Sequence, residues 1–314
     1  MSFEALKEKL RGVAFTTITP FSEDGDEVLY DELKQNARAI DEAGGEIFIP
    51  CGNSGEYYAL TDEERVMTVQ ATIEAVDDDN AVVAGVGGST KTAISLAEQY
   101  QEAGVDAIMV MHPDHTYLHE RGLLEYYRRI IEAVDCGVVL YKRGPELTED
   151  IIAELSTEDN VVAVKYAVND IKAFSRAVEN VPGDIVWSNG IAERFAPAFA
   201  LEGAEGFTTG IGNFVPEATL ALMDALRDED WERAKHVREV LRPYEDLREE
   251  TGPNNEFSAA NNVPAVKYGM ELAGRYGGPV REPLVELSEE DKERAEQYYE
   301  DIQEAVLEPE ATAD

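Results

Sequence analysis

The chain has 314 residues, of which 44% are hydrophobic, and carries a formal net charge of −38 from 65 acidic and 27 basic residues. A chain of this length buries one large core, so one structural unit is the simplest expectation. Its negative field repels nucleic-acid phosphates and anionic membranes, and we expect neither as a partner. Because the dispersed acidic residues also repel one another, we expect a halophilic protein that folds in high internal salt.

Targeting signals are not evident in the sequence. No apolar run of signal-peptide length lies near Met1, and nowhere are there 18 consecutive apolar residues. Cys51 and Cys136 lie in or beside apolar segments that we interpret as neighbouring buried strands, which favours free thiols over a disulfide. These features predict a cytoplasmic protein in a reducing compartment. The acidic segment from Glu308 to Asp314 is most simply a solvated tail.

Short apolar runs alternate with helical patterns from Gly12 to Leu226, as is typical of repeated β-α units. Most of these runs lack apolar-polar alternation, which indicates parallel strands buried on both faces. The predicted strands are Val13–Thr17, Glu46–Pro50, Ala81–Gly85, Ala107–Met111, Gly137–Tyr141, Val161–Lys165, Asp184–Ser188 and Gly206–Thr209. The predicted helices between them include Leu29–Ala43, Thr61–Val76, Lys91–Ala103 and Gly122–Val134.

Eight such units favour a closed (β/α)8 TIM barrel over an open doubly wound sheet, because no glycine-rich dinucleotide loop follows the first strand. The glycine-rich segment Gly85–Ser89 follows the third strand and lacks the lysine of a phosphate loop. We expect the barrel at residues 1–227 and a C-terminal helical extension at 228–314, packed together as one structural unit. Helices are predicted after the last strand at Pro216–Arg227, Trp231–Glu249, Asn262–Ala273 and Ser288–Ala305.

Function in such a barrel lies where the strands end, because the loops there gather residues from distant positions. The sixth predicted strand ends in Lys165, the one lysine of ten that lies in a strand core. A lysine in an apolar strand is costly unless it is paired or performs covalent work. Burial lowers the pKa of an amine, which favours a nucleophile that condenses with a ketone. A structural lysine paired with a carboxylate is the alternative.

Two further groups lie at the same predicted end of the barrel. Tyr141 closes the fifth strand and presents a phenol suited to moving protons, although a buried tyrosine also serves as packing. After the second strand, Asn53, Ser54 and Gly55 form a glycine-bracketed polar turn. Exposed amides and side-chain donors of this kind suit a carboxylate, and an ordinary strand-to-helix turn is the alternative.

Three of the four histidines, His112, His115 and His119, follow the fourth strand within eight residues. Together with Asp114 they are a candidate site for a divalent metal. Pro113 interrupts a shared helix face, however, and no His-Glu-x-x-His pattern is present. We therefore expect no metal, and Schiff-base chemistry on Lys165 would need no organic cofactor.

In combination, these elements resemble the dihydrodipicolinate synthase and N-acetylneuraminate lyase superfamily of Schiff-base barrel enzymes. The residues that carry the resemblance are Phe15–Phe21, Gly52–Glu56 followed by Leu60–Arg65, Tyr141 and Lys165. The resemblance implies that Lys165 forms the Schiff base and that Tyr141 is the proton shuttle. It also implies that Asn53 and Ser54, with the Gly55 amide, bind the keto acid carboxylate, and that the protein is a homotetramer.

Within the superfamily, Arg143 and the segments Gly210–Glu217 and Gly278–Leu284 resemble the branch of 5-dehydro-4-deoxyglucarate dehydratase and related 2-keto-3-deoxy sugar acid dehydratases. Lys142 stands where that branch usually has asparagine, and Gly144-Pro145 after Arg143 is a second departure. The family usually has two threonines where this chain has Asn53 and Ser54, which keeps the hydrogen-bonding ability of the clamp.

The resemblance thus implies a lyase of the hydro-lyase type that acts on a small 2-keto-3-deoxy sugar acid. The preferred reaction is dehydration of 2-dehydro-3-deoxy-D-arabinonate to 2,5-dioxopentanoate in pentose degradation, with Arg143 holding a distal hydroxyl or carboxylate. The alternatives are the decarboxylating 5-dehydro-4-deoxyglucarate dehydratase and a 2-keto-3-deoxygluconate aldolase. A sugar acid sensor with a structural Lys165, and a metal-dependent enzyme using the histidines, are the alternatives from other classes.

Overall fold

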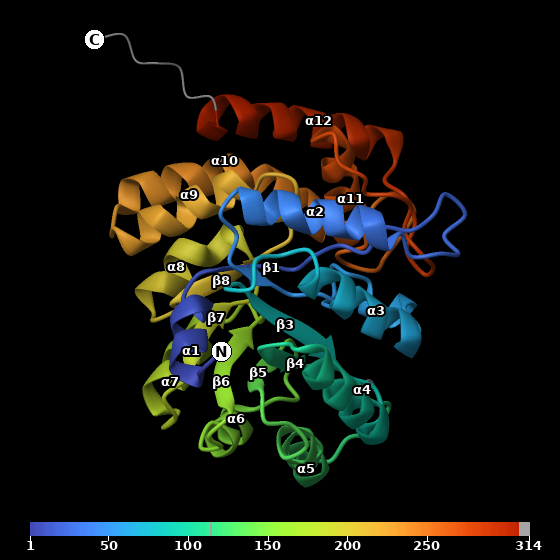
Figure 1. The fold of residues 1–314 in the computed structure, drawn as a ribbon. Coiled ribbons are helices and arrows are strands. Elements are labelled where there is room, and N and C mark those ends of the chain that lie inside the picture. Colours follow the sequence, from blue (N-terminus) through green and yellow to red (C-terminus); the bar gives the residue numbers. More distant parts are fainter. Residues whose placement is uncertain (114, 308–314) are drawn as a thin grey trace.

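The computed structural model describes residues 1–113 and 115–307 and has a closed parallel barrel at its centre (Figure 1). Each strand pairs with the next in the chain, and β1 pairs with β8 to close the ring. The predicted (β/α)8 barrel is therefore confirmed. Its strands are β1 (Val13–Phe15), β2 (Ile47–Phe48), β3 (Ala81–Val86), β4 (Ala107–Val110), β5 (Gly137–Lys142), β6 (Val161–Tyr166), β7 (Val186–Asn189) and β8 (Gly206–Thr209).

All eight strands were predicted in the right order, and their limits differ by a few residues. The first two are shorter than expected, although single cross-strand hydrogen bonds continue beyond Phe15 and Phe48. The two cysteines are free thiols, as expected, with Cys51 buried. Cys51 follows β2 and Cys136 precedes β5, however, and these two strands are not neighbours in the barrel.

Helices surround the barrel on the outside (Figure 1). They are α2 (Tyr30–Glu42), α3 (Asp62–Ile73), α4 (Thr90–Ala103), α5 (Glu120–Ile131), α6 (Glu149–Leu155), α7 (Ile171–Asn180), α8 (Ala196–Leu201) and α9 (Pro216–Arg227). Sequence signals explain several of their first turns. Thr61 and Glu64 form a capping box at α3, and the hydroxyl of Ser89 accepts the backbone N–H of Thr92 at the start of α4. The glycine-rich segment before α4 is thus a helix entry.

A short helix before the first strand, α1 (Phe3–Leu10), was not predicted. It packs against β6 and β7, and its Leu6 and Leu10 are buried. A Cβ on Gly137 would lie 2.6 Å from a Leu6 methyl, so β5 begins in close contact with this helix. The helix therefore lies at the end of the barrel where the strands begin.

Three more helices follow the barrel: α10 (Trp231–Glu249), α11 (Asn262–Leu272) and α12 (Glu289–Ile302), the last continuing into a π-turn at Gln303–Leu307. α10 packs on α9, and α11 and α12 pack on α10. The four helices expected after β8 are thus present, while the division at residues 227 and 228 stays a prediction. Within the described ranges, no helix combines the length and apolarity that a membrane crossing requires.

Candidate active site

Lys165, Tyr141 and Ser188 lie in one row across three neighbouring strands. In the barrel register, Lys165 of β6 pairs with Tyr141 of β5 on one side and with Ser188 of β7 on the other. Residues paired in this way point to the same face of a sheet. All three are buried near the carboxyl ends of their strands, which is where active sites of these barrels lie.

The Lys165 amine of this row has a strongly lowered pKa. Its residue is 6% exposed, and among the described residues no carboxylate forms an ion pair with it. Burial, followed by the positive charges of Arg143 and Arg248, lowers its pKa to about 7. A structural lysine paired with a carboxylate is therefore not what the structure shows. A large fraction of this amine is uncharged near neutral pH. A lysine that adds to a ketone must be in this uncharged form.

The phenol of Tyr141 lies between the lysine and the polar turn after β2. The Lys165 Nζ is 4.7 Å from the centre of the Tyr141 ring. The Asn53 side-chain amide donates a 3.0 Å hydrogen bond to the Tyr141 oxygen. Burial raises the pKa of Tyr141 to about 12, so the phenol keeps its proton at neutral pH and is available as a donor.

The turn of Asn53, Ser54 and Gly55 reaches the same site. A Cβ on Gly55 would lie 2.7 Å from the Thr17 carbonyl oxygen, so glycine is required for the turn to approach β1 so closely. Within the part of the chain that the structure describes, no acceptor takes the backbone N–H of Ser54 or Gly55. Two free amides beside a serine hydroxyl form an arrangement suited to a carboxylate.

Arg143 stands apart from the other predicted site residues because it is exposed, beyond the end of β5. Its charge nevertheless acts on both Lys165 and Tyr141, and lowers the pKa of each. Its neighbour Lys142 donates hydrogen bonds to the carbonyl oxygens of Gly144 and Leu147, at 3.1 and 2.7 Å. The departure from the branch pattern at Lys142 therefore has a local structural use, because it closes the loop that carries Arg143.

Sequence reasoning missed three polar residues at this end of the barrel. Ser188 lies beside Lys165 in the register described above. Among the described residues, none forms a hydrogen bond with the buried hydroxyl of Thr17 or the buried side-chain oxygen of Asn53, as is often true of ligand-binding atoms. Glu193, just after β7, is fully buried, near Thr209 and Glu245. Ser188 and Thr17 were within reach of sequence analysis, since both end predicted strands.

The histidine hypothesis finds no support in the described residues. No group of three or more His, Cys, Asp or Glu side chains there is arranged to hold a metal ion. The Nδ1 atoms of His115 and His119 accept local backbone N–H groups, and His119 caps α5. Asp114, the fourth proposed ligand, lies outside the described residues.

Two measurable cavities lie at the opposite end of the barrel from these residues. Their volumes are about 250 and 200 Å³, and both border Met223 and Arg227 of α9. One includes Gly206 at the start of β8, and the other includes Val13 at the start of β1. They therefore belong to the side of the molecule where strands begin, away from Lys165.

Comparison with known proteins decides the family. The sequence pattern of the dihydrodipicolinate synthetase family matches residues 9–302. The chain belongs to this family. A 4-hydroxy-tetrahydrodipicolinate synthase of Methanothrix thermoacetophila is 33% identical over 90% of this chain and 93% of its own length. The protein of the same name from Haloarcula marismortui is 29% identical over 89% of both chains.

A solved dihydrodipicolinate synthase, from Oceanobacillus iheyensis, superposes with a TM-score of 0.90. It is 36% identical and covers 95% of this chain and 98% of its own. As a member of the dihydrodipicolinate synthetase family, the chain is an enzyme, a lyase that forms a Schiff base. The superfamily expected from the sequence is confirmed. These relatives are named as synthases, so the comparisons do not single out the dehydratase branch.

Proposed function

We propose that this chain dehydrates a 2-keto-3-deoxy sugar acid, preferably 2-dehydro-3-deoxy-D-arabinonate, to give 2,5-dioxopentanoate. The observation that carries the proposal is the cluster of a buried amine of lowered pKa at Lys165, the protonated phenol of Tyr141 and the Asn53 amide bonded to it. A carboxamide orients the phenol but does not relay a proton, so Tyr141 exchanges its proton with the substrate.

Binding uses the turn after β2 and the loop after β5. The Ser54 hydroxyl and the Gly55 N–H receive the C1 carboxylate, with Asn53 beside them. This places the C2 ketone towards Lys165, at the bottom of the site. Arg143 lies at the exposed rim, where its guanidinium holds the distal hydroxyl or, in a glucarate-derived substrate, the second carboxylate.

The reaction begins when the neutral Lys165 amine adds to C2, Tyr141 supplies a proton and water leaves, forming a protonated imine and a phenolate. The phenolate takes a C3 proton, which gives an enamine, and the phenol then passes this proton to the C4 hydroxyl, which leaves as water. A proton then moves from C5 to C3, and the resulting C4-C5 enol becomes the aldehyde. Hydrolysis of the imine consumes one water and releases 2,5-dioxopentanoate. Two waters have left in the earlier steps, so the reaction loses one water overall. No metal or organic cofactor takes part in these steps.

The names of the relatives favour a second candidate, a 4-hydroxy-tetrahydrodipicolinate synthase. A synthase joins two substrates on the lysine, whereas a dehydratase needs one. The chemistry of Lys165 is common to both, and the two differ in what meets the enamine. Departure of a hydroxyl from C4 defines the dehydratase, and attack on a second carbonyl defines the synthase.

The test is product analysis with purified protein in molar potassium chloride, using 2-keto-3-deoxypentonate as the sole organic substrate. We expect 2,5-dioxopentanoate, no carbon dioxide and no pyruvate, and no product with Lys165→Ala. Pyruvate release would identify the aldolase, and carbon dioxide from 5-dehydro-4-deoxyglucarate would identify the decarboxylating enzyme. An imine trapped on Lys165 without any turnover would support the synthase and overturn the dehydratase. Binding of the sugar acid without imine formation would support the sensor.

By family resemblance we further propose a homotetramer. Light scattering at several salt concentrations measures the mass in solution, and a monomer in molar salt would contradict the proposal.

A further inference from the structure

The turn that carries residues 53–55 has an unusual backbone at both ends. Cys51 and Glu56, neither of them glycine, have positive φ angles of 57° and 54°. Residues with a Cβ hold this conformation only where the surrounding structure maintains it. Glu56 is also 5% exposed, so its carboxylate is withdrawn from water. Something in the protein must therefore hold Glu56 in place.

The group that meets Glu56 comes from the C-terminal extension. The Lys267 Nζ, on α11, is 2.6 Å from the Glu56 Oε1, and both side chains are almost completely buried. Lys267 is held in turn by the Pro279 carbonyl oxygen, at 2.5 Å, and lies over the Phe21 ring.

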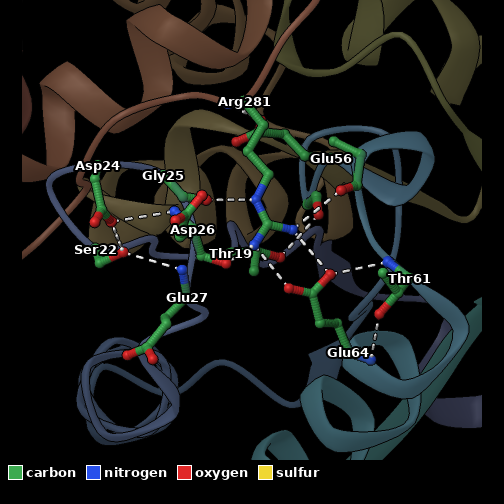
Figure 2. Close-up of polar contacts among 12 residues, drawn as sticks. Thr19, Ser22, Asp24, Gly25, Asp26, Glu27, Glu56, Thr61, Glu64 and Arg281 are labelled. Atoms are coloured by element: carbon green, nitrogen blue, oxygen red, sulfur yellow. Dashed lines mark hydrogen bonds and ion pairs between the residues drawn. The ribbon is translucent and has the colours of Figure 1, made fainter.

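The second oxygen of Glu56 is bound by the segment that follows α11. The Arg281 backbone N–H donates to the Glu56 Oε2 at 2.9 Å. The Arg281 guanidinium forms hydrogen bonds of 2.7 and 2.8 Å with the two carboxylate oxygens of Glu64, and a third with the Gly25 carbonyl oxygen (Figure 2). This segment is thus fastened to the loop after β1 and to the first turn of α3.

The pairing of Glu56 with Lys267 is a strict requirement because both groups are buried. Burial raises the pKa of Glu56 and lowers the pKa of Lys267, and the attraction between the two opposes both shifts. Removal of one partner leaves a buried charge without compensation, which is strongly destabilising at that point. The Glu56 backbone N–H also donates to the Asn53 carbonyl oxygen at 3.1 Å, so a shift of Glu56 moves Asn53.

We infer that Glu56 and Lys267 are positioning residues, through which the C-terminal extension holds the carboxylate clamp in its binding conformation. The inference rests on the proposed function in one respect, the assignment of residues 53–55 as the clamp. It does not depend on which keto acid is the natural substrate. Pyruvate, which consists of little more than the carboxylate and the ketone, is therefore a sufficient probe.

The experiment measures adduct formation on Lys165 by intact mass, with pyruvate and borohydride in molar potassium chloride. The half-saturating pyruvate concentration reports on the clamp, and the maximal rate reports on the imine. For Lys267→Met we expect the half-saturating concentration to rise about tenfold, which corresponds to about 1.4 kcal/mol of binding. The maximal rate should change much less, because Lys165 and Tyr141 are not touched.

Two double variants distinguish a change in the conformation of the turn from unfolding of the whole protein. Glu56→Gly/Lys267→Met removes both charges, and glycine holds a positive φ without strain. Glu56→Ala/Lys267→Met differs from it by a single Cβ, which strains the same conformation. We expect the glycine variant to bind pyruvate several-fold more tightly than the alanine variant and than Lys267→Met alone. Equal half-saturating concentrations in the two double variants would overturn the inference.

The control is Arg294→Met, which breaks ion pairs of 2.6 Å with Glu250 and 3.0 Å with Asp291, both within the C-terminal extension. It should lower the melting temperature and leave the half-saturating concentration unchanged. If Lys267→Met lowers the melting temperature but leaves the half-saturating pyruvate concentration unchanged, the pair of Glu56 and Lys267 stabilises the fold without positioning the clamp. No adduct in the wild-type protein would remove the Schiff-base site and this inference with it. A negative dehydratase assay with normal trapping would leave the inference standing.

Discussion

The side-chain amide of Asn53 and the phenol of Tyr141, which come from loops and strands 88 positions apart, are joined by a 3.0 Å hydrogen bond. The bond connects the proposed carboxylate clamp to the proposed proton donor. Because the amide donates to the phenolic oxygen, the hydrogen of the phenol is left to point elsewhere, towards a substrate. Clamp and acid are therefore oriented by one contact.

Replacement of Asn53 by alanine should lower turnover without preventing imine formation. The loss of the orienting bond leaves Tyr141 free to rotate, and we expect kcat to fall about 10- to 100-fold. Tyr141→Phe should cost at least as much, since it removes the phenol itself. In the double variant the losses should not add, because the two residues act as one unit. Fully additive losses would show that Asn53 does not work through Tyr141.

The rate of imine trapping with pyruvate should rise with pH and level off above pH 7. The pKa of Lys165 is lowered to about 7, and only the neutral amine adds to a ketone. Arg143→Gln removes a nearby positive charge that disfavours the ammonium, so the midpoint should move to higher pH. Arg176→Gln, on α7 outside the cluster, is the matched control. A midpoint that stays in place in Arg143→Gln would contradict the electrostatic link.

Glu193 should make the protein less stable as the pH rises above the ordinary carboxyl range. Burial, and next the charge of Glu245, raises its pKa from the ordinary value of 4.5. Above that value the folded chain keeps a proton that the unfolded chain releases, so the free energy of unfolding falls with pH until the folded carboxyl also ionises. Glu193→Gln abolishes this titration.

Urea denaturation in constant molar salt at pH 5 and pH 8 measures the effect. We expect Glu193→Gln to gain stability relative to the wild type between these pH values, by at least about 1.4 kcal/mol, the equivalent of one pKa unit. If the carboxyl is already ionised at pH 5, the difference in the free energy of unfolding between Glu193→Gln and the wild type will not change with pH. That result would contradict the prediction.

Salt should stabilise the protein strongly. The net charge of −38 makes the folded state repel itself, and the Debye length falls from about 10 Å at 0.1 M salt to about 3 Å at 1 M. We expect the melting temperature to rise by more than about 10 °C between these concentrations of potassium chloride, the equivalent of several kcal/mol. Sucrose is the control, since it favours compact states without screening charge. A melting temperature that does not change with salt would contradict the prediction.

The sequence was sufficient to predict the barrel and to select Lys165 and Tyr141, two of the three residues in the row inside it. Parallel strands buried on both faces are recognisable as apolar runs, and a lysine or tyrosine at the end of such a run stands out. The strand order then places those ends together without further information. Lys165 and Tyr141 were accessible to sequence reasoning for this reason, and Ser188 could have been added by the same argument.

Contacts that depend on the path of the chain outside the barrel could not be predicted. Glu56 reads as an ordinary acidic residue of a turn, and Lys267 as a polar residue of an amphipathic helix. Their burial follows from the way in which α11 returns to the barrel mouth, which no local pattern specifies. Glu193 is similar, because its pKa depends on its burial and on the charge of Glu245 of α10. Local periodicity describes one helix or strand at a time and does not predict contacts between residues of distant elements.

The contact between Glu56 and Arg281 also affects the order in which the site is completed during synthesis. Arg281, which fastens the segment to Glu56, is made 225 residues later. At a synthesis rate of about 5–20 residues per second, roughly 10–45 s separate the two on the ribosome. Lys165 is therefore made before the residue that supports the clamp. We expect keto acids in the cell to meet a finished binding site only after the segment around Arg281 has been made.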